Sequence, residues 1–186
     1  EINDIPFKAV IFDLFETLIT EWGHEKYTKR KMCEDLGVDK DCFDVFWKEM
    51  EEERYLGKID FEGSVLYAGS KLGKEIDSDK LAYVLNRRIA AKATCFEHID
   101  PEVLDMLDAI KKLGLRTAIV SNCSSEEVKV IRESELYRYF DEVVLSYEVH
   151  MKKPDRTVYE EAARRLGVEI KDCIFIIVLI MRLIIL

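Results

Sequence analysis

The stretch KAVIFDLFETL at residues 8–18 decides the fold class of this 186-residue chain. Residues 9–12 are all apolar, and the run ends at Asp13, with Thr17 four residues further on. A short apolar run of this kind is typical of a strand that is buried on both faces of a parallel sheet. Open parallel sheets bind their ligands at the carboxyl ends of the strands. The stretch therefore predicts an α/β fold with Asp13 at its functional edge.

The second half of the chain alternates strand patterns with helix patterns. Strands are expected at 115–120, at 142–146 and from about Cys173 onward, and helices at about 103–110 and 157–166. Strands that alternate with helices form a parallel sheet with right-handed crossovers. We therefore expect a Rossmann-like core.

The segment between these two regions has a different pattern. From about residue 21 to residue 94, apolar residues recur three or four positions apart within charged sequence, as in Leu81, Val84 and Leu85. Glycines and the segment 75–79 divide it into roughly four helices. The predicted organisation is a core formed by residues 1–20 and 96–186, with a mainly helical cap inserted at residues 21–95.

Composition limits the classes of partner and the compartment. The net charge of -9 argues against a nucleic-acid surface, which needs clustered Lys and Arg. The five cysteines have neither metal-ligand nor C-x-x-C spacing, and the acidic N-terminal residues do not resemble a secretion signal. The apolar C-terminal stretch is shorter than the ~20 residues of a membrane span. We expect a cytoplasmic protein with a small-molecule substrate; the oligomeric state is open.

Three strand ends supply the polar residues that are expected to form one site. The first is Asp13 with Thr17, the second is Ser121 with Asn122, and the third is Lys153 in the sequence Lys-Lys-Pro. The carboxyl ends of parallel strands lie at the same edge of a sheet, so these side chains should converge.

The motifs around these residues resemble a known family. FDLFETL at 12–18, IVSN at 119–122 and KKPDRTVYEEAARRLGV at 152–168 are similar, in order and spacing, to the first three motifs of the haloacid dehalogenase (HAD)-like hydrolase superfamily. The resemblance covers about residues 7–176. The helical insert between the first two motifs resembles the cap of the phosphatase and dehalogenase branch.

The resemblance implies a role for each residue. A carboxylate such as that of Asp13 can attack phosphorus or carbon and form an acyl intermediate that water then hydrolyses. Thr17 and Ser121 are expected to donate hydrogen bonds to the transferred group, and Lys153 to offset its developing negative charge. Asn122 is expected to bind the substrate. Of these five residues, the predicted catalytic ones are Asp13, Lys153, Ser121 and Thr17.

Structural explanations compete with these roles. An Asp after a strand is often only a turn or cap residue, and Lys-Pro-Asp is a common entry into a helix, which would leave Lys153 as a solvated lysine. Ser124 and Glu127 have capping-box spacing, so Ser124 is expected to be structural. The ordered set of motifs favours the catalytic explanation for Asp13 and Lys153.

Phe15 departs from the phosphatase pattern. Phosphatases of the family have a second Asp at this position, which protonates the leaving oxygen. Haloacid dehalogenases resemble this chain in having an aromatic residue there, because halide leaves without a proton. Phe15 is expected to contact the substrate in either case.

The C-terminal residues are a second departure. Thirteen of the fourteen residues from Cys173 to Leu186 are apolar, whereas the family continues with acidic residues that bind Mg²⁺. The metal ligands implied by the resemblance are then only Asp13 and the backbone carbonyl of Phe15, fewer than an octahedral Mg²⁺ site needs without waters. The tail from Ile177 is explained by a reading-frame or sequence-assignment error, by truncation, or by a real final strand; its abrupt start favours the first.

Three functions are compatible with this sequence. The first is an aspartate-nucleophile hydrolase acting on a small phosphorylated metabolite, with Mg²⁺ as the expected cofactor. The second is a metal-independent hydrolase of the 2-haloacid dehalogenase type, although no halide-binding arginine segment can be identified in the insert. The third is a binding or regulatory relative with impaired catalysis. The sequence favours the first and does not identify the substrate.

Overall fold

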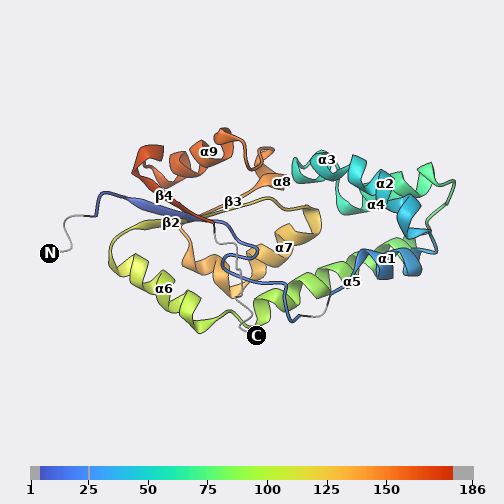
Figure 1. Cartoon of the computed structure of the whole chain (residues 1–186), viewed down its shortest axis with the longest axis horizontal. Helices are drawn as coiled ribbons and strands as arrows, with labels where there is room; N and C mark the ends of the chain where they lie inside the picture. Colours follow the sequence, from blue (N-terminus) through green and yellow to red (C-terminus); the bar gives the residue numbers. More distant parts are fainter. Residues whose placement is uncertain (1–4, 25, 178–186) are drawn as a thin grey trace, which may run out of the picture.

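The computed structural model describes residues 5–24 and 26–177, so the apolar tail at 178–186 lies outside the described residues and its explanation stays open. The described chain contains a parallel four-stranded sheet with the strand order β3-β2-β1-β4 (Figure 1). Its strands are β1 (Ala9–Phe12), β2 (Arg116–Ser121), β3 (Glu142–Leu145) and β4 (Cys173–Ile176). The α/β, Rossmann-like fold predicted from the sequence is confirmed.

Both faces of the sheet are covered by helices. Val10 and Phe12 of β1 pack into one apolar cluster, and Ala9 and Ile11 into another on the opposite face, as the two-residue repeat of a strand requires. One face is covered by α9 (Arg156–Leu166), and the other by α6 (Pro101–Lys112) and α7 (Ser125–Glu133). This double burial explains why β1 is uniformly apolar.

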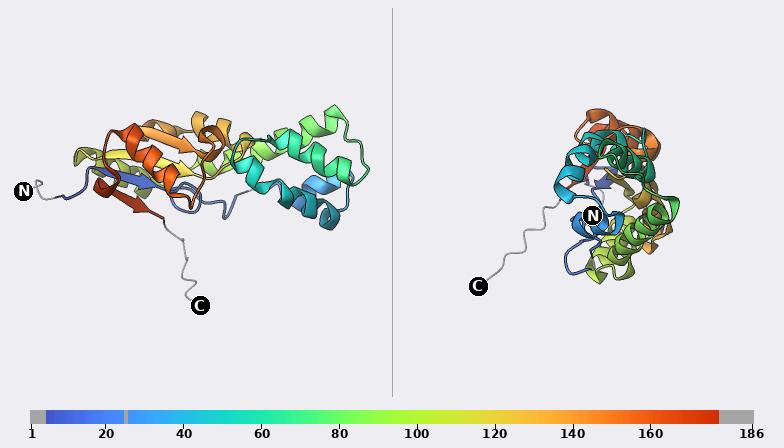
Figure 2. Two further views of the ribbon diagram at one scale, coloured as in Figure 1. Left: turned by 90° about the horizontal axis from the view of Figure 1, so that it is seen from above. Right: turned by 90° about the vertical axis from the view of Figure 1, so that its right-hand side faces the viewer.

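The long segment between β1 and α6 forms a helical layer beyond the carboxyl ends of the strands (Figure 2). These insert helices are α1 (Lys29–Leu36), α2 (Lys40–Glu49), α3 (Glu51–Tyr55), α4 (Phe61–Lys71) and α5 (Ser78–Glu97). They enclose an apolar cluster of their own, in which Phe43, Phe61 and Val65 are fully buried. The boundaries of a separate cap domain stay a prediction.

Side-chain caps explain where most insert helices begin. Thr28 and Asp39 accept hydrogen bonds from backbone N–H groups in the first turns of α1 and α2, and Asp60 and Asp77 do the same for α4 and α5. The sequence predicted roughly four helices here, whereas the structure also has the short α3. Met50, at φ -92° and ψ 4°, separates it from α2, and the sequence has no Gly or Pro at that position.

Short elements complete the described chain. These are the 3₁₀ helices at Glu135–Tyr139 and Ile170–Asp172 and the one-turn helix α8 (Ser146–Val149), which starts where the third strand was expected to end. Within residues 5–24 and 26–177, no helix combines the length and the hydropathy that crossing a membrane requires.

Candidate active site

The structure brings Asp13 and Lys153 together, although 139 residues of sequence separate them. Asp13 follows β1, and Lys153 lies in the loop between α8 and α9; the Nζ of Lys153 forms an ion pair with Oδ1 of Asp13. Both side chains are largely shielded from solvent, being 20% and 16% exposed. A carboxylate that keeps some access to solvent beside a fixed cation is suited to react with an anionic substrate.

Backbone hydrogen bonds hold Asp13 in place. Its N–H donates to the carbonyl of Ile176 at 3.0 Å, which continues the ladder between β1 and β4. The N–H of Leu14 donates to Oδ1 of Asp13 at 2.7 Å. The carboxylate is therefore fixed by the end of the strand that the sequence predicted.

Asn122 holds the backbone of Lys153. Its Nδ2 donates to the carbonyl of Lys153 at 3.0 Å, and its Oδ1 accepts from the N–H of the same residue at 2.8 Å. The peptide bond between Lys153 and Pro154 is cis. These two hydrogen bonds connect the end of β2 with the lysine; the substrate-binding role expected for Asn122 stays a prediction.

Ser121 lies at the end of one central strand, and Thr17 lies in the turn that follows the other. Ser121 is the last residue of β2 and is buried, with its hydroxyl 3.4 Å from the carbonyl of Asn122. Thr17 lies in the turn after β1, where its N–H donates to the carbonyl of Leu14. Their roles toward a transferred group stay predictions.

The turn after β1 is stabilised by a residue that the sequence analysis did not select. Glu16 has a φ of 57°, which is uncommon for a residue with a side chain. Its carboxylate accepts hydrogen bonds from the hydroxyl of Thr20 and the N–H of Glu21. Glu16 therefore shapes the segment that leads from Asp13 into the insert.

Phe15 occupies the position of the missing acid. Its ring is half-buried and meets the ring of Phe96 edge-on, with the centroids 6.4 Å apart. The ammonium group of Lys92 lies 4.8 Å from the centroid of the Phe15 ring. A cation therefore lies against the ring at this position, and Phe15 itself transfers no proton.

Lys92 is held between two carboxylates. Its side chain is 14% exposed and pairs with Glu21 and, at 2.8 Å, with Glu127. Burial by itself would lower the pKa of Lys92, but the two carboxylates outweigh it and the pKa is raised. Lys92 is therefore a permanent cation that links α5 to the N-terminus of α7 and to the segment after β1.

A second buried charge cluster lies at the same interface. Arg54 is 5% exposed, stacks on the ring of Trp47 and donates to its carbonyl at 2.8 Å. Glu126 is 3% exposed; its Oε1 lies 3.3 Å from Nε of Arg88, and its Oε2 has no hydrogen-bond partner within the described residues. Sequence reasoning missed this cluster because nothing in the spacing links these positions.

Three residues near the site are structural. Ser124 and Glu127 form the predicted capping box of α7. Cys123 is fully buried, and burial raises the pKa of its thiol to about 12, so it is not a nucleophile at neutral pH.

The described residues do not form a closed magnesium site. In the part of the chain that the structure describes, no group of three or more His, Cys, Asp or Glu side chains could hold a metal ion. Asp13 is already paired with Lys153, and Phe15 would add only a backbone carbonyl. This donor set is too small for the oxygen-rich octahedral coordination that Mg²⁺ requires.

Known proteins similar to this chain include both enzyme classes expected from the motifs. (S)-2-haloacid dehalogenase 1 of Pseudomonas sp. (strain CBS-3) is 32% identical over 177 residues, which cover 92% of this chain and 76% of that protein. Glyceraldehyde 3-phosphate phosphatase of Methanopyrus kandleri is 29% identical over 178 residues, which cover 91% of this chain and 74% of that protein.

Solved structures share the fold of this chain. A HAD family enzyme of Bacteroides thetaiotaomicron superposes with a TM-score of 0.66 at 18% identity, covering 91% of this chain and 83% of its own. An L-2-haloacid dehalogenase superposes with a TM-score of 0.56 at 20% identity. The haloacid dehalogenase-like hydrolase family model matches residues 7–176. The chain therefore belongs to the haloacid dehalogenase-like hydrolase family, and the relatives named above are enzymes.

Proposed function

We propose that this hydrolase uses Asp13 as its nucleophile on a small, anionic molecule. One oxygen of Asp13 attacks the substrate, the bond to the leaving group breaks, and the leaving group departs with the bonding electron pair. Water then attacks the acyl intermediate, which regenerates the carboxylate and releases the product. The observation that carries this proposal is the ion pair between Asp13 and Lys153, with the backbone of Lys153 held by Asn122.

The surroundings of Phe15 favour a substrate whose leaving group needs no proton. Phe15 cannot donate one, and its charged neighbour Lys92 is held by carboxylates as a cation. A halide on the carbon next to a carboxylate leaves directly as an anion, and no step of this displacement requires a metal ion. Relatives that are (S)-2-haloacid dehalogenases support this substrate class.

Phosphate-ester hydrolysis, the function that the sequence favours, is the second candidate. Its support is the similarity to the Methanopyrus kandleri phosphatase and to a phosphoglycolate phosphatase of Nitrosospira multiformis that is 25% identical. A phosphatase with Phe15 would need substrates whose leaving oxygen is already a weak base, such as aryl phosphates. A cytoplasmic location stays a proposal, and neither candidate function depends on it.

The nucleophile is tested by Asp13→Asn. The amide keeps the shape of the carboxylate but is a poor nucleophile, so turnover should fall by more than about 10³-fold with an unchanged circular dichroism spectrum. Asp155→Asn is the matched control, because Asp155 is exposed and lies two residues from Lys153. Activity of Asp13→Asn near that of the wild type would contradict the proposal.

The substrate class is tested with 2-chloropropionate and p-nitrophenyl phosphate in the presence of excess chelator. Release of chloride under these conditions supports metal-free dehalogenation. Phosphate release that stops on chelation and returns with Mg²⁺ supports the phosphatase instead. Turnover of neither substrate would favour the third possibility, a relative with impaired catalysis.

Phe15→Asp tests whether the missing acid is the only group that phosphatase activity lacks. The new carboxylate would lie beside the ammonium group of Lys92. This pairing disfavours the protonated form that a general acid needs. We therefore expect only a small gain of phosphatase activity, whereas a large gain would show that the missing acid was the single obstacle.

A further inference from the structure

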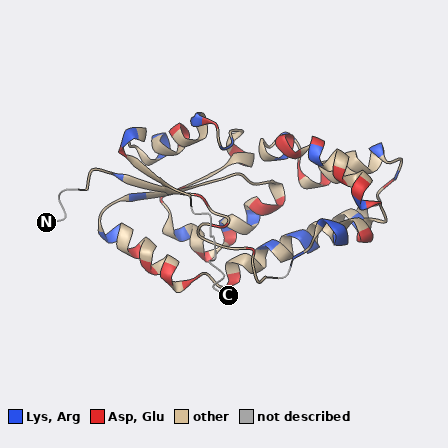
Figure 3. Cartoon of the chain, in the orientation of Figure 1, with Lys and Arg blue, Asp and Glu red and all other residues tan. Residues whose placement is uncertain are grey.

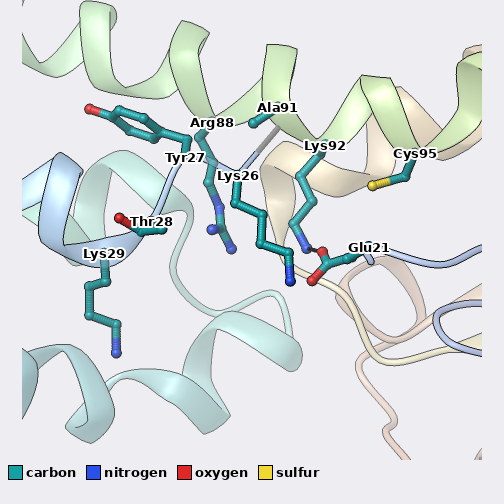
Figure 4. A pocket seen from close by; sticks show the side chains of 9 residues that line it. All are labelled: Glu21, Lys26, Tyr27, Thr28, Lys29, Arg88, Ala91, Lys92 and Cys95. Carbon is teal, nitrogen blue, oxygen red and sulfur yellow. Dashed lines mark hydrogen bonds and ion pairs between the residues drawn. The ribbon is translucent and has the colours of Figure 1, made fainter. Parts of the chain in front are cut away.

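A small pocket lies between the two connections that join the sheet to the insert helices. Its volume is about 150 Å³, well below the ~300–1,000 Å³ of pockets that hold drug-sized ligands. Figure 4 shows the side chains that line it, which come from the segment between β1 and α1 and from α5. They are Glu21, Lys26, Tyr27, Thr28, Lys29, Arg88, Ala91, Lys92 and Cys95.

Cations dominate the lining. Among the described residues, the lining contains four cations, Lys26, Lys29, Arg88 and Lys92, and one carboxylate, that of Glu21. Residues 26–31 (KYTKRK) contain four cations and no acid, although the whole chain has a net charge of -9. Figure 3 shows Lys and Arg gathered along α1 and α5.

Carboxylates inside and outside the lining pair with three of these four cations in the described part of the chain. Lys29 pairs with Asp44, and Lys92 is held by Glu21 and Glu127. Arg88 meets Glu126 through its Nε, and this buried carboxylate also lies close enough to Arg54 to interact with it. The terminal groups of Arg88 and Lys26 extend toward Glu21 in the pocket (Figure 4).

Of these four cations only Lys26 is exposed, and Glu21 lies near enough to interact with its charge. The ammonium group of Lys26 lies 4.7 Å from the centroid of the Trp22 ring. Trp22 is 68% exposed, so this contact is solvated and weak. The first turn of α1, which begins beside the pocket, contains no acid to offset the positive end of the helix dipole.

We propose that this pocket binds a single carboxylate or phosphate group, held mainly by Lys26 and Arg88. The group belongs either to the substrate, as an anion remote from the bond that is cleaved, or to a separate anionic effector. The segment between β1 and α1 and the helix α5 both line the pocket, so a bound anion would contact both connections between the sheet and the insert. The binding itself does not depend on the proposed function; only its assignment to the substrate does.

Equilibrium dialysis with radiolabelled inorganic phosphate, at constant ionic strength, tests the site directly. We expect saturable binding to the wild-type chain. Lys26→Gln and Arg88→Gln should each weaken it about tenfold, as loss of one charge-assisted hydrogen bond implies. Lys129→Gln, an exposed lysine of α7 that does not line the pocket, should leave binding unchanged.

Lys153→Gln separates this pocket from the candidate active site. Binding that is lost in Lys153→Gln but kept in Lys26→Gln would place the phosphate beside Asp13 and overturn the proposal. So would the absence of saturable binding to the wild type. Arg88→Lys keeps the positive charge, so it should bind phosphate more tightly than Arg88→Gln does. This result would show that the loss of binding in Arg88→Gln comes from the lost charge and not from a folding defect.

Trp22 offers a local readout. A phosphate that draws Lys26 into the pocket would remove the ammonium group from the Trp22 ring, so Trp22 emission should change with the same affinity as in dialysis. This change should disappear in Trp22→Phe. Once a substrate is known, inhibition of its turnover by phosphate separates the two sources of the anion. Competitive inhibition that is weaker in Lys26→Gln would mean that the pocket binds an anionic group of the substrate. Non-competitive inhibition would mean that it binds a separate effector.

These outcomes are distinguishable from failure of the proposed function. If Asp13→Asn were fully active, the nucleophile assignment would fail, while phosphate binding and its dependence on Lys26 would be unaffected. Conversely, unchanged binding in both Lys26→Gln and Arg88→Gln would remove the pocket proposal and leave the role of Asp13 standing.

Discussion

At the scale of single residues, Asn122 shows how a side chain can act through another residue. Both polar atoms of its carboxamide bond to the backbone of Lys153. Asn122→Ala would leave that backbone N–H and carbonyl without these partners and would loosen the lysine beside Asp13. We expect kcat to fall about tenfold or more, with little change in KM, because the effect falls on the reacting groups.

The split between kcat and KM separates this positioning role from the substrate-binding role that the sequence predicts. A residue that binds the substrate uniformly would raise KM instead. Asn86→Ala, at an exposed position of α5, is the control and should leave both constants unchanged. A pure KM effect in Asn122→Ala would show that the hydrogen bonds to Lys153 are not what matters.

At the scale of elements, Gly57 determines how closely α3 approaches α8. It has a φ of 66°, and a Cβ at this position would lie 2.0 Å from the carbonyl oxygen of Tyr147. Gly73 has nearly the same φ, 64°, but nothing within 4 Å. Gly73→Ala should therefore cost about 1–2 kcal/mol of unfolding free energy, from left-handed backbone strain alone. Gly57→Ala should cost clearly more.

Thermal unfolding and kinetics of the two variants test this difference. The added methyl of Gly57→Ala must push α3 away from α8, which also breaks the hydrogen bond between His150 and the carbonyl of Leu56. We expect Gly57→Ala to change KM as well as stability and Gly73→Ala to change stability alone. Equal losses of stability would mean that the contact between the two helices adjusts freely.

The carboxylate of Glu21, which pairs with Lys92 of α5, should make the stability of the fold depend on pH in the acidic range. Burial alone would raise the pKa of Glu21, but its hydrogen bond to Lys92 and the nearby cations lower it below the ordinary value of 4.5. A lowered pKa in the folded state stabilises the fold above pH 4.5, and this contribution is lost as the pH falls through the folded value. Glu21→Gln should therefore show a shallower loss of stability below pH 4.5.

Denaturant midpoints measured between about pH 7 and pH 2 test this expectation. Glu161→Gln is the comparison, because Arg164 and Arg165 lower the pKa of Glu161 to about 2. Its effect on the curve should extend down to about pH 2. A Glu21→Gln curve parallel to that of the wild type would show that Glu21 gains nothing from Lys92 in the folded state.

The sequence predicts the elements well where local pattern and burial agree. The apolar run before Asp13 predicted β1 to within one residue, and the helix expected at 157–166 is α9, Arg156–Leu166. The ends of the strands also placed Asp13 near Lys153. What local pattern could not predict is the use of Asn122 for the backbone of Lys153, or the pairing of Lys92 with Glu127, because such contacts leave no periodicity in the sequence.

At the scale of the whole molecule, α5 connects the apolar cluster of the insert to one cluster of the sheet, because Val84 belongs to the first and Cys95 and Phe96 to the second. Trp47, Phe43 and Phe61 belong to the cluster of the insert, and the strands belong to the other two. Lys92 and Glu127 pair where α5 packs on α7, and the side chain of Glu127 is 8% exposed. The pair therefore adds a charge contact to the apolar packing that holds α5 against α7.

Lys92→Met should remove this charge contact. Methionine keeps the length of the side chain but leaves Glu127 buried without its cation, which typically costs about 3–5 kcal/mol. This destabilisation applies only while the insert packs on α7, so the insert should open first. Lys171→Met is the control, since Lys171 pairs with Glu169 where both side chains are about 70% exposed, and such pairs contribute ~0–1 kcal/mol.

Hydrogen exchange measured by mass spectrometry in rising denaturant follows the two units separately. Peptides from α2 and α4 report on the insert, and peptides from β2 report on the sheet. In the wild type both should lose protection together, whereas in Lys92→Met the insert should lose it at a lower denaturant concentration. If both sets of peptides shifted equally in that variant, Lys92 would stabilise the molecule as one cooperative unit, and the charge pair would not be what holds the insert against the sheet.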